Sequence, residues 1–423
     1  MKPIAPPRGT RDVLPEAAAA WRWLHETHAG VAASHGYQPI ETPVFESTEM
    51  FARGVGAGTD VVDKEMYTFT DRGGRSLTLR PEGTAPVLRA VLGARLEQRA
   101  RPVRVHYAMS MFRYDRPQAG RQRQFAQVGA ECIAERDPSY DAEVIAVAWR
   151  FMGALGIRGV DLQVNTLGSH ADRTRYRAAL VEYYAPLRDS LCDDCRRRLE
   201  VNPLRLLDCV RDRDHVAGAP VLDDHLDDAS REYFDEVLRH LDDSEVPHTR
   251  NARLVRGLDY YSDTAFEFWH TSLAGAQNAL GGGGRYDGLA EVLGFPPTPG
   301  VGYALGVERI LVVAQNQGLA PAASAAANVY VCSAQSEDDA RAEAVATQLR
   351  WRSGVVTDLT ARRLDRKLRE ADRAGALLAV LVGVDGGIVL RNLRTHSQHD
   401  VTEETVLDKV SEELLRAAGA TPP

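Results

Sequence analysis

The stretch PVRVHYAMSMFRYDRPQAGRQRQFAQVGAECIA, residues 102–134, decides the fold. It predicts two strands, 102–112 and 124–134, because runs rich in β-branched, aromatic and other apolar residues lie on both sides of a polar loop. Strands joined by so short a connection pair in the antiparallel direction. We therefore predict an antiparallel sheet and an α+β fold, rather than a sheet built from strand–helix–strand units.

The second of these strands has two chemically different faces, because alternate side chains of a strand point to opposite sides. One face carries small and apolar residues, namely Ala126, Val128, Ala130 and Cys132. The other carries an aromatic ring, an amide, a bare backbone and a carboxylate, namely Phe125, Gln127, Gly129 and Glu131. The first face predicts core packing. The second suits a polar, nitrogen-rich ligand, with simple solvation as the alternative.

The loop between the two strands is strongly basic. Residues 95–123 contain eight arginines and two acids, which gives a local charge of +6. Guanidinium groups bind phosphate oxygens through paired, charge-assisted hydrogen bonds worth about 1.5–3 kcal/mol each. The loop therefore predicts a site for a polyphosphate or an RNA backbone in preference to a solvated loop.

The whole chain has the composition of a cytoplasmic globular protein. Its 423 residues are 44% hydrophobic and 26% charged, which leaves room for two or three domains. Five scattered cysteines favour a reducing compartment over a disulfide scaffold. Residues 1–15 lack the apolar segment of a signal peptide, and no apolar run approaches the roughly 18 residues of a membrane span. We expect a cytoplasmic protein without a membrane partner.

Charge is unevenly distributed along the chain. The formal net charge is −8, yet residues 221–245 alone contain ten acids and two arginines. The remainder is neutral overall, with positive charge gathered in residues 95–123 and 350–373. The second segment holds eight cations and four acids and, taken alone, is typical of a solvated helix. The negative total therefore does not exclude an RNA-binding protein.

Shorter patterns predict the elements around the central strands. Apolar residues at helical spacing predict a helix over 15–34. Two β-rich runs around a turn signal predict a hairpin over 66–80. Residues 259–269 are typical of a strand. The glycine run 281–284 indicates either a backbone that approaches a ligand closely or a flexible connection.

The domain organisation follows from shifts in composition. Residues 167–247 are helical in pattern and very polar, which indicates an inserted helical module. An Ala-, Pro- and Ser-rich stretch at 318–327 is typical of a linker. Strands alternate with helices beyond it, as in a small α/β domain. We expect one domain over 1–322, interrupted by the module, and a second over 327–423.

Several motifs in combination resemble the class II aminoacyl-tRNA synthetases and, within that class, the histidyl-tRNA synthetase family. The resemblance covers nearly the whole chain. It rests on RGTRDVLP at 8–15, Arg113 with Arg121 and Phe125, RGLDYY at 256–261, GGGRYD at 282–287 and GVER at 306–309. RGLDYY and GGGRYD are the motifs that indicate histidine specificity, since the others would indicate only the class.

This resemblance implies a fold, an activity and partners. The fold is the class II antiparallel sheet flanked by helices, with a helical insertion and a C-terminal α/β anticodon-binding domain. The activity is a ligase that forms histidyl-adenylate and pyrophosphate from histidine and ATP with Mg²⁺, and then transfers histidine to the 3′ end of its tRNA. The implied partners are histidine tRNA, contacted in part by residues 350–373, and a second copy of the chain in a homodimer.

Residue roles in ATP binding also come from the resemblance. Arg113 and Arg256 correspond to the catalytic arginines that hold the α-phosphate from opposite sides. Arg309 corresponds to the γ-phosphate ligand, Arg121 to a further ATP-binding residue and Phe125 to the ring that stacks on adenine. Adenylation then needs positioning and charge stabilisation rather than a covalent nucleophile. Asp115 stands where the family usually has Glu, which shortens that side chain by one methylene.

Histidine binding is implied for six positions. Glu82, Thr84 and Gln127 correspond to residues that hold the α-amino group, and Glu131 and Tyr261 to those that hold the imidazole. Tyr260 is assigned to the same substrate site. Gln127 and Glu131 belong to the polar strand face, so periodicity and resemblance indicate the same place. A site that pairs both ring nitrogens rejects analogues by roughly 10⁴–10⁵, so no editing domain is needed.

Two other functions remain open at this point. One is a catalytically silent paralogue that regulates histidine biosynthesis by binding an ATP phosphoribosyltransferase. Such subunits typically lack the C-terminal domain and have lost RGLDYY-type residues, whereas this chain keeps Arg256 and about 100 residues beyond the linker. The other is a different class II specificity, which would make both histidine motifs coincidental.

Cys192, Cys195 and Cys209 lie in the predicted helical module. A CxxC spacing suits zinc, and Cys209 or His215 would add further ligands. Only one CxxC is present, so inert cysteines are the favoured interpretation and zinc is the alternative. The histidines show no HExxH or HxH spacing, and we therefore expect no catalytic metal bound by histidine.

Overall fold

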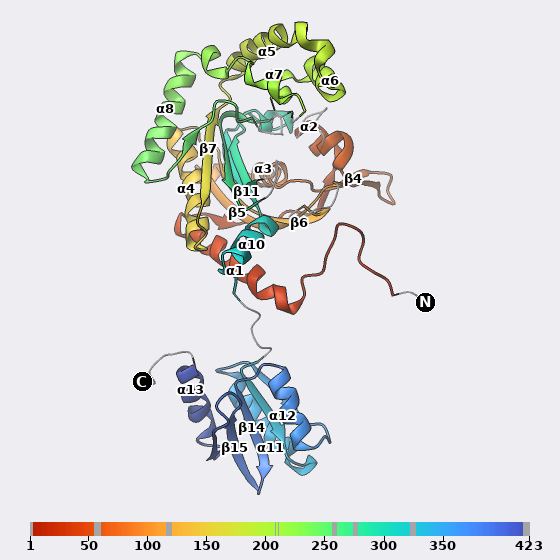
Figure 1. Cartoon of the computed structure of the whole chain (residues 1–423), viewed down its shortest axis with the longest axis vertical. Coiled ribbons are helices and arrows are strands. Elements are labelled where there is room, and N and C mark those ends of the chain that lie inside the picture. Colours follow the sequence, from red (N-terminus) through yellow and green to blue (C-terminus); the bar gives the residue numbers. More distant parts are fainter. Residues whose placement is uncertain are drawn as a thin grey trace. The chain divides into compact units, whose positions relative to one another are not determined.

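The computed structural model describes residues 3–54, 61–115, 121–207, 209, 211–255, 260–273, 278–321 and 327–417. They form a large unit within residues 3–321 and a small unit whose main part is 327–417 (Figure 1). Each unit has its own core and is described by itself. No helix in the described part of the chain has both the length and the apolar character to cross a membrane.

An eight-stranded sheet forms the centre of the large unit. Its strands run in the order β1 (Gln38–Pro39), β5 (Val103–Phe112), β6 (Gln124–Ile133), β11 (Gly300–Gly306), β10 (Ala279–Arg285), β9 (Ser262–His270), β7 (Val160–Thr166) and β8 (Thr249–Arg250). The pairs β1–β5 and β7–β8 at the two edges are parallel, and the others are antiparallel. The predicted strand pair, strand direction and fold class are confirmed.

Helices cover both faces of this sheet (Figure 1). α1 (Pro15–Ser34), α4 (Pro138–Ala154) and α10 (Val307–Asn316) share a core with the predicted apolar face of β6. α3 (Thr84–Gly93) and α9 (Leu289–Val292) pack on the other face, against β5. The helix predicted over 15–34 is confirmed, whereas α3 and α4 had no sequence prediction. The short helix η2 (Leu96–Gln98) follows α3.

A small sheet lies beside the central one. β2 (Phe45–Ser47), β4 (Ser76–Leu79) and β3 (Thr68–Thr70) pair in that order. The antiparallel pair β3–β4 confirms the hairpin predicted over 66–80. α2 (Thr48–Gly54) and the π-helical turn η1 (Val61–Glu65) complete this region.

The inserted module is helical, as predicted. It contains α5 (His170–Tyr184), η3 (Ala185–Ser190), α6 (Asp193–Val201), η4 (Pro203–Leu206), α7 (Arg213–Ala217), η5 (Leu222–His225) and α8 (Asp228–Asp243). α8 packs into the main core through Phe234, Val237 and Leu241. The elements from α5 to η5 instead bury a small core of their own, at the top of the view in Figure 1.

The small unit is a five-stranded sheet with helices, as the alternating pattern predicted. Its order is β13 (Val355–Asp358), β12 (Val329–Ser333), β14 (Leu378–Val384), β15 (Gly387–Asn392) and β16 (Gln398–Val401). The first three strands are parallel and the last two join antiparallel. The helices are η7 (Ser336–Asp338), α11 (Asp339–Arg350), α12 (Leu364–Arg373) and α13 (Val406–Ala417). β15 and β16 had no sequence prediction.

Candidate active site

A pocket of about 430 Å³ opens over β6, β10 and β11, a volume within the range of small-molecule sites. Residues from the β5–β6 connection, the start of α10 and the segment before α3 complete its wall. Nine residues predicted for the site line it, namely Glu82, Thr84, Arg113, Arg121, Phe125, Gln127, Tyr260, Tyr261 and Arg309. Arg256 lies outside the described residues. The polar face of β6 therefore faces a cavity rather than bulk solvent.

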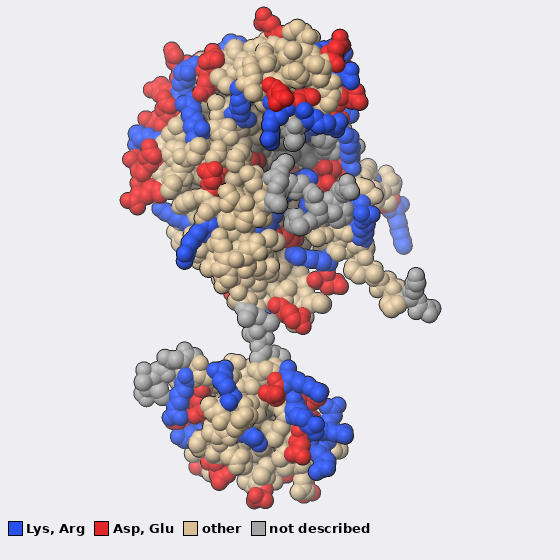
Figure 2. Space-filling model, viewed as in Figure 1, with Lys and Arg blue, Asp and Glu red and all other residues tan. Residues whose placement is uncertain are grey.

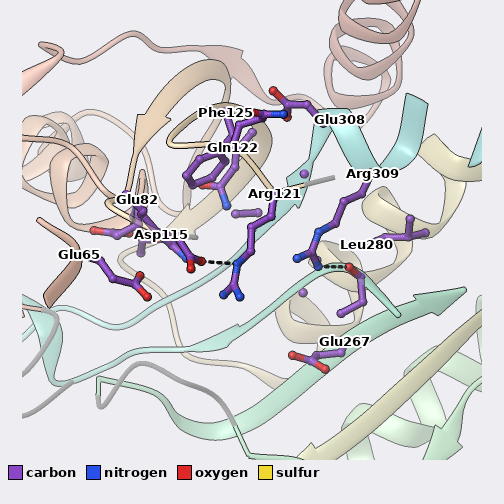
Figure 3. Close-up of a pocket in the computed structure, with 18 of the residues that line it drawn as sticks. Glu65, Glu82, Asp115, Arg121, Gln122, Phe125, Glu267, Leu280, Glu308 and Arg309 are labelled. Carbon is purple, nitrogen blue, oxygen red and sulfur yellow. Dashed lines mark hydrogen bonds and ion pairs between the residues drawn. The ribbon is translucent and has the colours of Figure 1, made fainter. Parts of the chain in front are cut away.

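Three of the arginines that line the pocket, Arg113, Arg121 and Arg309, lie near one another, among carboxylates that also line it. Burial lowers the pKa of Arg309, and the nearby charges of Arg121 and Arg113 lower it further. Burial likewise lowers the pKa of Arg113. In Figure 3, Arg121 and Arg309 point into the same space. Guanidinium groups that lower one another's pKa are stabilised when a negative charge lies between them. Together they therefore form a binding site for an anion with several oxygens.

Contacts with the protein fix each of these arginines. The Arg113 Nε donates to the Pro81 carbonyl at 2.8 Å, and its guanidinium carbon lies 5.4 Å from the centre of the Phe125 ring. Arg121 pairs with Asp115, and Arg309 donates to the Ala279 carbonyl (Figure 3). The shorter acid at position 115 is therefore oriented by an arginine of the same connection.

Gln127 carries an unsatisfied acceptor into the pocket. Its Oε1 atom is buried and accepts no hydrogen bond from the described residues. A buried amide oxygen without a partner costs about 1–3 kcal/mol, so a site that retains one is built to receive a donor from a ligand. Nearby, Glu82 is 3% exposed and accepts the Thr84 and Ala85 N–H groups at 2.6 and 3.1 Å. Glu82 thus caps the start of α3 as well as lining the pocket.

Glu131 lies beneath the pocket and is not one of the residues that line its open space. Its side chain has no exposed surface and accepts hydrogen bonds from Tyr286 at 2.7 Å, Thr84 at 2.9 Å and Tyr107 at 3.4 Å. Burial raises the pKa of this carboxyl to about 8, against the lowering effect of these hydrogen bonds. A buried acid with a pKa near neutrality is typical of a functional group.

Two glycines make room for this arrangement. A Cβ on Gly302, which faces Glu131 across the β6–β11 pair, would lie 1.6 Å from a Glu131 carboxylate oxygen. A Cβ on Gly283 would lie 1.9 Å from the Gly302 carbonyl oxygen. The glycine run 281–284 is therefore part of strand β10 and permits close packing. A flexible connection, one of the two readings of this run, is wrong.

Two tyrosines close the side of the pocket near Glu131. The rings of Tyr260 and Tyr261 lie 4.7 Å apart, and Tyr260 meets Tyr286 edge-on at 6.1 Å. The Tyr261 carbonyl accepts a hydrogen bond from Arg173 of α5 at 2.6 Å. The inserted module thus contacts the backbone of the motif that carries these tyrosines.

Several residues of this region had no role predicted from the sequence. Tyr107 and Tyr286 donate to Glu131, while Glu267 and Arg205 line the pocket. Tyr107 belongs to the apolar face of β5, and its spacing is that of a core residue. Arg205 comes from η4 of the inserted module, for which the sequence indicated no role in the site.

Solved structures agree with this architecture. The apo histidyl-tRNA synthetase of Staphylococcus aureus matches with a TM-score of 0.81 and 33% identity, covering 96% of this chain and 99% of that protein. An antiparallel sheet with an arginine-lined pocket on one face, joined to a small α/β unit, defines a class II aminoacyl-tRNA synthetase.

The family follows from sequence comparisons. A model of the histidyl-tRNA synthetase family matches residues 9–171 and 208–310, and one of the anticodon binding domain matches 328–413. The histidine–tRNA ligase of Rhodococcus erythropolis is 45% identical over 414 residues, and that of Listeria monocytogenes serotype 4b is 42% identical over 414 residues. Each alignment covers 96% of this chain and 97% of the relative. The chain belongs to the histidyl-tRNA synthetase family, whose members are ATP-dependent ligases.

Proposed function

We propose that this chain activates histidine with ATP, forming histidyl-adenylate and pyrophosphate, and transfers the histidine to the 3′ end of its tRNA. The observation that carries the proposal is the pocket that combines three charged arginines with the unsatisfied Gln127 oxygen. Histidine-dependent exchange of pyrophosphate into ATP tests the first step directly. Exchange supported equally by other amino acids, or none at all, would contradict the proposal.

In this proposal the arginines orient ATP for in-line attack by the histidine carboxylate. Arg113 holds the α-phosphate, Arg121 and Arg309 bind the outer phosphates, and Phe125 stacks on adenine. Arg256 is assigned the opposite side of the α-phosphate from the resemblance alone. Because the charged donors are already fixed by protein contacts, they stabilise the developing negative charge with little reorganisation.

Mg²⁺ fits the donor chemistry of the same pocket. Glu65, Asp115 and Glu267 line it, and carboxylate oxygens together with phosphate oxygens are the ligands that Mg²⁺ prefers. The ion, when bound, would neutralise phosphate charge. The protein's own part is to hold these carboxylates beside the arginines, so that cation and polyphosphate are bound together.

Histidine occupies the end of the pocket near β6 in this proposal. The Gln127 oxygen accepts from the α-amino group, with Glu82 and Thr84 beside it. Glu131, Tyr260 and Tyr261 bind the imidazole. The imidazole would approach Glu131 from the pocket at the carboxylate oxygen that accepts the hydrogen bond from the Thr84 hydroxyl. A ring nitrogen that pairs with a fully buried carboxyl is recognised strongly, because an analogue would leave that group unpaired.

Histidine affinity should depend on pH through Glu131. A buried pair of imidazole and carboxyl is neutral when it holds one titratable proton in total. Before binding, free histidine and Glu131 together hold one such proton between about pH 6.5, the usual pKa of imidazole, and about 8, the pKa of Glu131. Binding must release a proton below this window and take one up above it. We expect the Kd for histidine, measured by calorimetry without ATP, to be lowest inside the window and to rise on both sides.

The Glu131→Gln variant provides the control for this pH profile. It cannot titrate at position 131, so its rise in Kd at high pH should move up to the titration of histidine's own amino group. A wild-type profile that stays flat between pH 7 and 9 would show that Glu131 does not exchange a proton with the ligand.

The regulatory alternative is disfavoured by the small unit, which the chain retains as a complete sheet with three α-helices in the described range 327–417. The same exchange assay separates the two functions, since a regulatory subunit would bind histidine without forming pyrophosphate.

We also propose domain boundaries at 1–322 and 327–423, and a cytoplasmic homodimer in which α1 and β1 contribute to the interface. Light scattering would then give twice the chain mass of 46.4 kDa.

The small unit supplies a basic surface for the tRNA anticodon. A hollow on this surface is lined by residues of α12 and by Arg362, which lies two residues before the helix. The lining residues are Arg362, Arg366, Arg369, Glu370 and Arg373. Figure 2 shows Lys and Arg gathered on the side of this unit where α12 lies. Lys367 faces inward instead and donates to the Ser333 carbonyl at 2.9 Å. Arg366, Arg369 and Arg373 are exposed on α12 and could meet phosphates, although Arg373 also pairs with Glu370 at 2.8 Å.

Removal of two of these charges should weaken tRNA binding and its salt dependence. For Arg366→Gln/Arg369→Gln we expect roughly tenfold lower affinity for histidine tRNA and a salt slope reduced by about 1.4, which corresponds to two single-strand phosphate contacts. Histidine-dependent pyrophosphate exchange should not change. Arg416→Gln, which alters a surface arginine paired with Glu413 in the same unit, is the matched control. An unchanged salt slope would place the anticodon elsewhere.

A further inference from the structure

Three cysteines and one aspartate of the inserted module bring their ligand atoms together. This cysteine cluster consists of Cys192, Cys195, Cys209 and Asp212, whose sulfur and carboxylate oxygen atoms all lie within 4.8 Å of one another. Cys192 immediately precedes α6 and Cys195 lies in its first turn, while Cys209 and Asp212 follow η4. Residues distant by up to 20 positions therefore converge on one point.

The spacing of the donors fits a single tetrahedral zinc ion. Zn–S bonds of about 2.3 Å and Zn–O bonds of about 2.1 Å place two sulfurs about 3.8 Å apart and a sulfur and an oxygen about 3.6 Å apart. The Cys192 and Cys209 sulfurs are 3.8 Å apart, and the Cys209 sulfur lies 3.7 Å from the Asp212 Oδ2. The distance between the Cys192 and Cys209 sulfurs is too long for a disulfide, which requires about 2.05 Å.

Neighbouring groups already orient the donors. The Cys192 N–H points at the Asp212 carboxylate, at 3.1 and 3.3 Å from its two oxygens. Cys192 stands immediately before α6 and Cys195 lies in its first turn, so the start of one helix holds both sulfur atoms. Cys195 is fully buried, so its sulfur faces the cluster rather than solvent.

The module around the cluster has only a small core of its own. Its own core consists of a small set of residues between α5 and η5, and Cys195 and Cys209 belong to it. In α6 only Cys195 and Leu199 are buried, and most of its other side chains are charged. Small cores of this kind are marginal without disulfides or metals, and metal binding contributes directly to folding.

We propose that the cysteine cluster binds one structural Zn²⁺ ion. The ion ties the start of α6 to the segment after η4 and so fixes the fold of the module between them. This reverses the interpretation favoured from sequence, inert cysteines, because spacing alone could not show that Cys209 and Asp212 return to the CxxC. The proposal does not depend on the ligase reaction, since the ion takes no part in chemistry.

Metal content tests the proposal on the full-length protein. We expect the protein, purified without chelators and dialysed against metal-free buffer, to retain about one zinc per chain. Cys209→Ser should lose it. Cys332→Ser removes a fully buried thiol from the small unit and is the matched control that should keep its zinc. Wild-type protein without zinc after incubation with Zn²⁺, or full zinc retention by Cys209→Ser, would overturn the proposal.

Two further measurements keep the test decisive if Cys209→Ser folds poorly. Cobalt substituted into the wild-type protein should give the visible and thiolate charge-transfer bands of a tetrahedral sulfur site, and Asp212→Asn should shift those bands. Mass spectrometry under non-reducing conditions should find Cys192 and Cys209 as free thiols once the metal is removed under nitrogen. A Cys192–Cys209 disulfide in the freshly purified protein, or cobalt spectra without thiolate bands, would refute zinc binding here.

Discussion

Replacing Arg113 with glutamine should lower the rate of histidine-dependent ATP–pyrophosphate exchange by about 10²–10³-fold at saturating substrates. Arg113 stands at the end of β5, where its Nε bonds the Pro81 carbonyl and leaves the charged end toward the pocket. A glutamine amide can still donate to that carbonyl, so the local fold should survive while the positive charge is lost. The thermal unfolding midpoint should therefore change little.

The control for this variant is Arg75→Gln. Arg75 lies in the β3–β4 hairpin, its side chain is 80% exposed and it pairs with Asp71 across the turn. Its loss removes the same charge from the protein without touching the pocket, and exchange should stay at the wild-type rate. If Arg113→Gln retained full activity, Arg113 could not be the α-phosphate ligand.

Glu131→Gln should reduce kcat/KM for histidine by roughly 10³-fold, with the KM for ATP changed less than about threefold. The amide keeps the size of the side chain, but it has a single acceptor oxygen. Tyr286 and Thr84 donate to different oxygens of Glu131, so one of these hydroxyls must instead accept from the amide N–H. The amide cannot hold a proton in exchange with the imidazole, so the loss falls on histidine recognition. Pyrophosphate exchange, with histidine and ATP varied in turn, separates the two effects.

Glu143→Gln is the matched carboxylate control for Glu131→Gln. Glu143 on α4 accepts from Arg104 and Tyr37, and it does not line the pocket. We expect normal kinetic constants for both substrates in this variant. Unchanged histidine kinetics in Glu131→Gln would mean that Glu131 only supports the hydroxyl groups around it and that the imidazole binds elsewhere.

The strand periodicity of residues 124–134 was enough to predict the core face of β6 and to distinguish it from the polar face, of which Phe125 and Gln127 line the pocket. It could not predict how deeply each side chain is buried. Glu131 lies beneath the floor of the cavity rather than in its wall. Tyr107 was missed because a tyrosine that donates to a buried carboxyl has the same spacing as one in a core. α4 escaped prediction because it is apolar over most of its surface, and a helix buried on several sides lacks the usual amphipathic pattern.

The contribution of the inserted module to the pocket could not be predicted, because it depends on tertiary packing between segments distant in sequence. The β10 glycines show a similar limit. Glycine runs are ambiguous in sequence, and only the approach of the Gly302 carbonyl to Gly283 explains why side chains are excluded there. The charge pattern was more informative, since the two basic segments correspond to the arginines of the pocket and of α12.

Arg205, which lines the pocket, lies in η4, between Cys195 and Cys209 of the cysteine cluster. A bond between the two ends of this segment would restrict the positions that Arg205 can take in the pocket wall. If the proposed zinc ion and a nucleotide at Arg205 favour the same position of η4, each must strengthen the equilibrium binding of the other by the same factor. The affinity for the nucleotide and the affinity for zinc would then depend on each other through the segment between Cys195 and Cys209.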